Sequence, residues 1–122
     1  MRIKIPNEMR ENALLARLLK NNGFSGGTMT AMMRMEQLIQ DTHIDLDDLR
    51  AIRNWLARHI HSSYPSYLRW IMNGKPMTDE YKRLGGIFSW LAWGGNAAID
   101  LVNKYNDVLN ETFDTYYVKL KI

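Results

Sequence analysis

The chain has no cysteine in its 122 residues, only three prolines, and no long apolar run. The lack of cysteine excludes disulfide bonds, thiolate metal sites and a cysteine nucleophile, and it fits synthesis in a reducing cytoplasm. Because a membrane-spanning helix needs about 20 apolar residues in succession, we expect no membrane partner. The first residues also lack the apolar core of a secretory signal, so we expect an unprocessed protein.

An excess of charge of one sign is also missing, since 16 basic residues are offset by 13 acidic ones and the net charge is +3. These charges are interspersed along the chain, so the basic excess is weak evidence for a nucleic-acid partner. The eight methionines are many for this length, and such sets either fill cores, which is commoner, or form adaptable binding surfaces. The length predicts one domain over residues 1–122.

Apolar residues recur at helical spacing along most of the chain. Capping residues such as Thr28, Asp45 and Thr78 precede several of these segments, and Asn-Gly pairs follow some of them. The pattern predicts helices over residues 6–23, 28–40, 45–61, 65–73, 78–93 and 96–110. Gly85-Gly86 predicts a kink or the close packing of another helix inside the fifth of them. The expected fold class is mainly α, a compact bundle of five or six helices.

The densest apolar stretch is residues 87–98, in which Trp90 and Trp93 are followed by Gly94-Gly95. Tryptophans three residues apart share one face of a helix, and each large aromatic side chain buries roughly 150–250 Å². The glycine pair allows a sharp turn or the close approach of another element. We expect this stretch to lie at the centre of the core.

The two ends of the chain have an alternating pattern instead. Residues 1–5 and residues 115–122 each alternate apolar with other side chains, which predicts two short β-strands. These strands can pair with each other across the helices or with a neighbouring molecule, and both arrangements stay open. The candidate contacts in a lattice of molecules are Ile3, Ile5, Val118 and Leu120.

Two groups of residues are candidates for binding an anion. Gly26 and Gly27 precede a helix, whose free backbone N–H groups can hold an anion, but the spacing and the lysine of a phosphate-binding loop are missing and a plain turn is commoner. Arg50 and Arg53 form a basic face on the third expected helix. This face either meets the phosphates of a nucleic acid or is simply solvated.

Signs of an enzyme are few. His43, His59 and His61 do not share a helix face, so their spacing forms no metal site. A Ser–His–acid arrangement built on Ser62 or Ser63 would be a chance match. We therefore expect a protein that is not an enzyme, with no catalytic, cofactor-binding or metal-binding residues and no cofactor.

Four short motifs, taken in order, resemble a small domain of unknown function found in tailed phages and large DNA viruses, often near head proteins. The motifs and their supporting residues are Gly26-Gly27-Thr28, Ala57-Arg58-His59, Tyr64-Pro65 and Trp93-Gly94-Gly95, with Phe24, Arg34, Gln37, Trp55, Trp70 and Trp90. Each motif is common alone, whereas their order and spacing together are specific. That domain usually has an acid and a glycine where this chain has Asn96 and Ala98, and a glycine at the place of Ala31, so any carboxylate-dependent activity would be lost here.

The resemblance implies a viral origin and a shared polar set of Arg34, Gln37, Arg58 and His59, which forms either a buried network or a contact surface. We accordingly expect a non-enzymatic virion protein, a small head-associated or minor capsid component made in the host cytoplasm. Its partners would be other virion proteins or copies of itself. The alternatives are a basic accessory protein that binds nucleic acid and an inhibitor of a host defence system.

Overall fold

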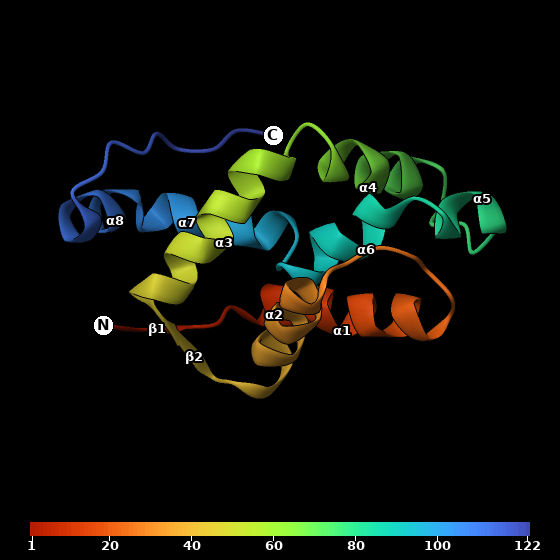
Figure 1. The fold of residues 1–122 in the computed structure, drawn as a ribbon, viewed down its shortest axis with the longest axis horizontal. Coiled ribbons are helices and arrows are strands. Elements are labelled where there is room, and N and C mark those ends of the chain that lie inside the picture. Colours follow the sequence, from red (N-terminus) through yellow and green to blue (C-terminus); the bar gives the residue numbers. More distant parts are fainter.

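The structure is a computed structural model that describes residues 1–122, and eight helices and two short strands follow one another along the chain (Figure 1). Their bounds are β1 Arg2–Lys4, α1 Asn7–Asn21, α2 Met29–Gln40, β2 His43–Asp45, α3 Leu46–His59, α4 Ser63–Met72, α5 Asp79–Lys82, α6 Gly85–Ala92, α7 Asn96–Lys104 and α8 Asn106–Phe113. The predicted mainly α fold is confirmed. None of the helices is both long enough and apolar enough to cross a membrane.

The helix expected over residues 78–93 is divided in two. Leu84 leaves helical geometry, with a ψ of 91°, and separates α5 from α6. The expected close packing at Gly85-Gly86 is also present, because a Cβ atom on Gly86 would lie 2.7 Å from the Cα atom of Ser63 at the start of α4. A side chain at this position would push two helices apart.

The last expected helix, residues 96–110, is likewise two helices. The chain bends at Tyr105, where α7 ends and α8 begins, and α8 continues to Phe113. The polar run after Leu109 is therefore helical, although its composition suggests a break. Asn110 in this run bonds the backbone of the C-terminal segment at Tyr117.

The core surrounds α6, which packs against α1, α2 and α4 (Figure 1). The α6 residues Phe88, Trp90 and Leu91 are all at most 1% exposed. The expectation that residues 87–98 lie at the centre of the core is confirmed. Gly94 and Gly95, whose φ values are 105° and 64°, then turn the chain sharply into α7.

The methionines serve both as core and as surface residues. Met9 and Met35 are 0% and 1% exposed and fill the core. Met29 and Met33 on α2 and Met72 on α4 are 76%, 67% and 76% exposed. The use of methionine therefore differs from position to position in this chain.

The strand expected at the N-terminus is present, but its partner lies inside the chain. β1 pairs antiparallel with β2, the segment just before α3, and Ile3 lies opposite Ile44. Ile3 and Ile5 point into the core and are 2% and 0% exposed. Both residues are therefore core residues and are not free to form lattice contacts.

The strand expected over residues 115–122 is wrong. This C-terminal segment runs in an extended course across the top of the view in Figure 1, but no strand pairs with it. Asparagine side chains of α7 and α8 hold its backbone instead. Asn103 accepts a hydrogen bond from the N–H of Leu120 and donates one to its carbonyl oxygen, both at 2.8 Å. Asn110 does the same for Tyr117, at 2.7 and 2.9 Å.

Replacing Asn110 with alanine should release the C-terminal segment. The change removes two hydrogen bonds to the Tyr117 backbone and one from the Thr115 hydroxyl. At about 1 kcal/mol for each bond, and with some replaced by water, we expect the free energy of unfolding to fall by about 1–2 kcal/mol. Hydrogen exchange at the Tyr117 amide should become faster.

A matched control is Asn73→Ala, because the Asn73 amide bonds only the Arg69 carbonyl oxygen of its own helix. Denaturation and amide exchange should be measured for both variants. An unchanged exchange rate at Tyr117 in the Asn110 variant would contradict the role of this side chain.

Candidate functional site

Four side chains stack in one column that runs between two surface hollows. Arg34 of α2 lies over the ring of Trp93, with its Cζ atom 5.2 Å from the ring centroid. Trp93 stacks on Trp55 of α3 at 5.1 Å and 8°, and Trp55 stacks on His59 at 4.2 Å and 12°. Aromatic pairs of this kind contribute about 0.5–1.5 kcal/mol beyond the area they bury. The column thus fixes a guanidinium group at one end and an imidazole ring at the other.

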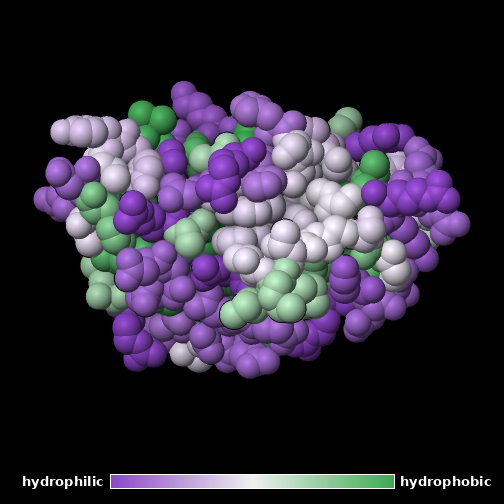
Figure 2. Space-filling view, viewed as in Figure 1, coloured by the Kyte–Doolittle hydropathy of each residue, from purple (hydrophilic) through white to green (hydrophobic).

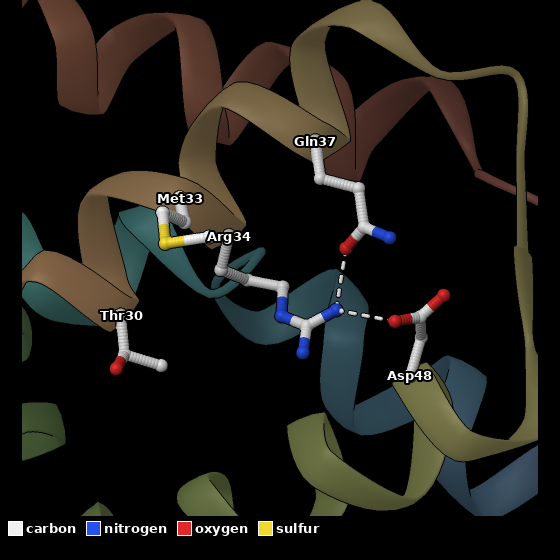
Figure 3. A pocket seen from close by; sticks show the side chains of 5 residues that line it. All are labelled: Thr30, Met33, Arg34, Gln37 and Asp48. Carbon is white, nitrogen blue, oxygen red and sulfur yellow. Dashed lines mark hydrogen bonds and ion pairs between the residues drawn. The ribbon is translucent and has the colours of Figure 1, made fainter.

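At the first end, Arg34 links α2 to the start of α3. Its Nη1 atom donates to the Asp48 Oδ1 atom at 3.1 Å and to the Gln37 side-chain oxygen (Figure 3). The Arg34 and Asp48 side chains are 13% and 27% exposed, and they line a hollow of about 390 Å³ together with Gln37, Thr30 and Met33. The buried Nε atom of Arg34 has no hydrogen-bond partner.

The Asp48 carboxylate is ionised more easily than usual. Burial by itself raises its pKa, but the hydrogen bond from the Asp45 backbone N–H and the hydrogen bond and positive charge of Arg34 outweigh it. The net effect lowers the pKa of Asp48 below its ordinary value of 3.8. The carboxylate therefore stabilises the folded chain only in its charged form.

This lowered pKa predicts a pH dependence of stability. The unfolded chain binds the proton more readily, so the contribution of Asp48 is complete above the unfolded-state pKa of about 3.9 and is lost as the pH falls through the lower native pKa. Between about pH 5 and pH 2, stability should decline less steeply in Asp48→Asn than in the wild type.

Urea denaturation at several pH values in this range measures how steeply the free energy of unfolding changes with pH. The matched control is Asp47→Asn, since Asp47 is exposed and makes no ion pair. Equal slopes for the wild type and the Asp48 variant would show that Asp48 titrates normally.

At the other end of the column, His59 lines a second pocket. The His59 Nδ1 atom lies 2.8 Å from the Trp55 carbonyl oxygen, which can only accept a hydrogen bond. Nδ1 is therefore the protonated nitrogen, and in the neutral ring Nε2 is left as an acceptor. We call this second hollow, of about 290 Å³, the glycine pocket; its lining residues are Gly26, Gly27, Thr28, Ala31, Trp55, His59, Ser63, Gly85, Gly86 and Ser89.

The glycine pocket lies where three stretches of backbone come together without side chains between them: Gly26-Gly27, Gly85-Gly86 and the start of α4 at Ser63. A Cβ atom on Gly26 would lie 2.4 Å from the Gly85 carbonyl oxygen, and one on Gly27 would lie 2.4 Å from the Phe88 ring. Both residues have positive φ, 104° and 82°. The two glycine pairs, which are far apart in the sequence, thus meet as a single crossing.

The structure brings together two of the four residues expected as a polar set and places the other two apart from them. Arg34 and Gln37 are joined by a hydrogen bond, and His59 lies at the opposite end of the same column. Arg58 is exposed and takes part in no salt bridge. The rotation of α3 that turns His59 toward Trp55 turns Arg58 outward.

The basic face expected at Arg50 and Arg53 lies beneath aromatic side chains from the end of the chain. The Arg50 Cζ atom is 4.5 Å from the centroid of the Phe113 ring, and the Arg53 Cζ atom is 4.0 Å from that of Tyr117. Both arginines are half-buried as a result. These two guanidinium groups hold the C-terminal segment against α3.

The expected lattice residues of the C-terminal segment differ from each other. Val118 is 73% exposed, whereas Leu120 is half-buried and packs against the core. Leu120 faces inward because its backbone is held by Asn103. Of the four residues expected to form lattice contacts, Val118 is the exposed one.

Sequence reasoning missed several residues of these two hollows. Asp48 is recognisable as a capping residue, and it caps α3 while also binding Arg34. The sequence marks Ser63 only through the chance Ser–His–acid match and Ser89 only through the resembling motif that ends in Trp93-Gly94-Gly95, and neither signal places them in a pocket. Asn96, which replaces the acid of the resembled domain, accepts a hydrogen bond from Trp90 Nε1 at 2.8 Å.

The face shown in Figure 2 is mostly hydrophilic, with several smaller apolar areas between the hydrophilic ones. A pale area of intermediate hydropathy covers α4 and α6, right of centre, and a pale green patch lies over α2, whose exposed apolar residues are Met29 and Met33. Comparison with protein-family models, with curated proteins and with solved structures finds no match for this chain. The arrangement of its own residues therefore has to carry the functional proposal.

Proposed function

We propose that this chain is a non-enzymatic viral virion protein, a small head-associated or minor capsid component. The convergence of the motifs that resemble a viral domain supports this proposal. Gly26-Gly27-Thr28 and His59 line one pocket, Trp93 stacks in the column beside it, and Tyr64 packs on Trp90 at 5.1 Å.

The observation that carries the contact role is the exposed C-terminal segment. Its outward side chains Tyr116, Val118 and Ile122 are 93%, 73% and 51% exposed. Single exposed apolar residues are ordinary, but here they follow one another along an extended backbone. The segment exposes these apolar side chains, interspersed with Lys119 and Lys121, while Asn103 and Asn110 hold its inner side.

Backbone groups of this segment are also free. The N–H groups of Tyr116, Val118 and Lys119 donate no hydrogen bond within the chain. An extended segment with free N–H groups and alternating apolar side chains is a template for β-strand addition. The partner we propose is an extended strand of a neighbouring virion protein or of another copy of this chain.

Quantitative mass spectrometry of purified virus particles tests the proposal. The particles should be washed in about 1 M salt, where charges are screened beyond about 3 Å. We expect a fixed copy number that survives the wash, and its loss in the variant Val118→Asp. Met72→Asp is the matched control, because Met72 is 76% exposed but lies on α4.

Other outcomes would count against the proposal. Presence only in the lysate of infected cells would exclude a virion role. Release by the salt wash would point to the nucleic-acid alternative, because phosphate contacts weaken steeply with salt. Retention of the Val118 variant at full copy number would show that another surface makes the contact.

A further inference from the structure

We propose that the glycine pocket binds a phosphate group. This inference does not depend on the virion role, because it concerns a different surface of the molecule. The pocket is lined by residues of α2, α3, α4, α6 and the loop before α2, and neither Asn103 nor Asn110, which hold the C-terminal segment, is among them. Its chemistry follows from the residues that line it.

The first turns of three helices line the pocket together. Thr28 caps α2, Ser63 is the first residue of α4, and Gly85-Gly86 begin α6; these helices have 12, 10 and 8 residues. The backbone N–H groups of Ser63, Gly85 and Gly86 donate to no acceptor in the chain. Free N–H groups and the positive ends of helix dipoles favour an anion.

Ser63 provides an independent indication of a ligand. The residue is only 6% exposed, lines the pocket, and its hydroxyl makes no hydrogen bond within the chain. Solvent still reaches the hydroxyl oxygen, and a bound anion would replace water as its hydrogen-bond acceptor. The same anion would satisfy the N–H groups beside it.

The remaining polar groups select phosphate among anions. None of the residues that line the pocket is acidic, so a negative charge meets no repulsion there. In its neutral form, with Nδ1 donating to the Trp55 carbonyl oxygen, His59 presents the lone pair of Nε2 to the pocket. Monohydrogen phosphate carries both negative oxygens and one O–H group that can donate to Nε2, whereas sulfate carries no proton at neutral pH.

The space suits a phosphate that is free or attached to a larger molecule. The pocket has a volume of about 290 Å³, which exceeds that of the ion, and it opens to the surface. The indole of Trp55 forms part of its wall. Inorganic phosphate and a phosphate monoester are therefore the two sources that an experiment should separate.

Nuclear magnetic resonance titration of the full chain labelled with ¹⁵N tests the inference. Sodium phosphate should be added against sodium chloride at matched ionic strength, with sodium sulfate and O-phosphoserine as further arms. We expect saturable shifts at the amides of Gly26, Gly27, Ser63, Gly85 and Gly86. The titration should be run at about pH 6.5, where part of a phosphate monoester, with its second pKa of about 6, still carries an O–H group. Sulfate should bind more weakly than phosphate, and tighter binding of O-phosphoserine than of inorganic phosphate would identify a monoester as the source.

Ser63→Ala should weaken phosphate binding roughly 5–10-fold, which corresponds to the loss of one hydrogen bond. Ser62→Ala is the matched control, because Ser62 is exposed, neighbours Ser63 and forms no side-chain cap. Ser89→Ala provides a second lining variant if the Ser63 variant does not fold. Unsaturable shifts, shifts centred on exposed arginines, equal binding of sulfate, or wild-type affinity in the folded Ser63 or Ser89 variant would overturn the proposal.

Discussion

Replacing Trp90 with alanine is expected to lower the free energy of unfolding by about 3–5 kcal/mol. Trp90 is 0% exposed, and its ring lies 5.1 Å from that of Tyr64 and 6.2 Å from that of Trp55. The change opens a large cavity between α3, α4 and α6. It also leaves the Asn96 side-chain oxygen without the indole N–H that it accepts from.

Urea denaturation followed by circular dichroism measures this loss. Trp90→Phe is the matched variant, since it keeps an aromatic ring but lacks the N–H group, and we expect it to cost about 1–2 kcal/mol. An alanine variant within about 1 kcal/mol of the wild type would contradict the central place of Trp90 in the core.

The second large effect is expected at the glycine crossing, from Gly26→Ala. The new Cβ atom would lie 2.4 Å from the Gly85 carbonyl oxygen and 2.6 Å from the Gly85 Cα atom, and backbone cannot move aside as a side chain can. The φ of 104° adds a conformational penalty of about 1–2 kcal/mol. With an overpacking cost of about 1–3 kcal/mol, we expect a total loss of about 2–5 kcal/mol.

Gly74→Ala separates these two causes. Gly74 also has positive φ, 83°, but a Cβ atom there would meet nothing within 4 Å. The control should therefore show the conformational penalty alone. The difference in the free energy of unfolding between the two variants then measures the cost of the steric clash at the glycine crossing. Similar losses of stability in both variants would show that α6 moves away from the loop before α2 at little cost.

Much of the helical architecture is predictable because it is encoded locally. Thr28 and Asp45 cap the helices that follow them, and their side chains accept the expected hydrogen bonds from Ala31 and Asp48. Most helices end or bend where the helical spacing of the apolar residues is interrupted or where a glycine occurs. The bend at Leu84 is recognisable from Gly85-Gly86, whereas the bend at Tyr105 has no comparable signal.

The strand partners could not be predicted, because they depend on contacts distant in sequence. β2 has three residues, too few for an alternating pattern to be recognised. At the other end, the alternation of residues 115–122 indicates extended backbone correctly, but it does not say what pairs with it. Side-chain amides of Asn103 and Asn110 replace a strand there, and asparagine in a helix is ordinarily read as a sign of its end.

The candidate site was predictable only in part, for a similar reason. The resemblance predicts Arg34, Gln37 and His59 as a polar set, which stays a prediction, and nothing local places Trp55 and Trp93 between Arg34 and His59. The column forms because α2, α3 and α6 pack around the same centre. Ser63 lies in the glycine pocket because Gly86 has no side chain, since a Cβ atom there would be 2.7 Å from the Ser63 Cα atom.

Because the methionines differ in exposure, their oxidation can report how often the core of the protein opens. Peroxide converts accessible methionine to the sulfoxide, so Met29 and Met72, both 76% exposed, should react first. Met9 is 0% exposed, and its methyl group lies against Gly94, where a Cβ atom would be 2.9 Å away. A sulfoxide at Met9 therefore requires α1 to part from the turn between α6 and α7. The extra oxygen mass on the peptide that carries Met9 would count how often the core opens during the exposure.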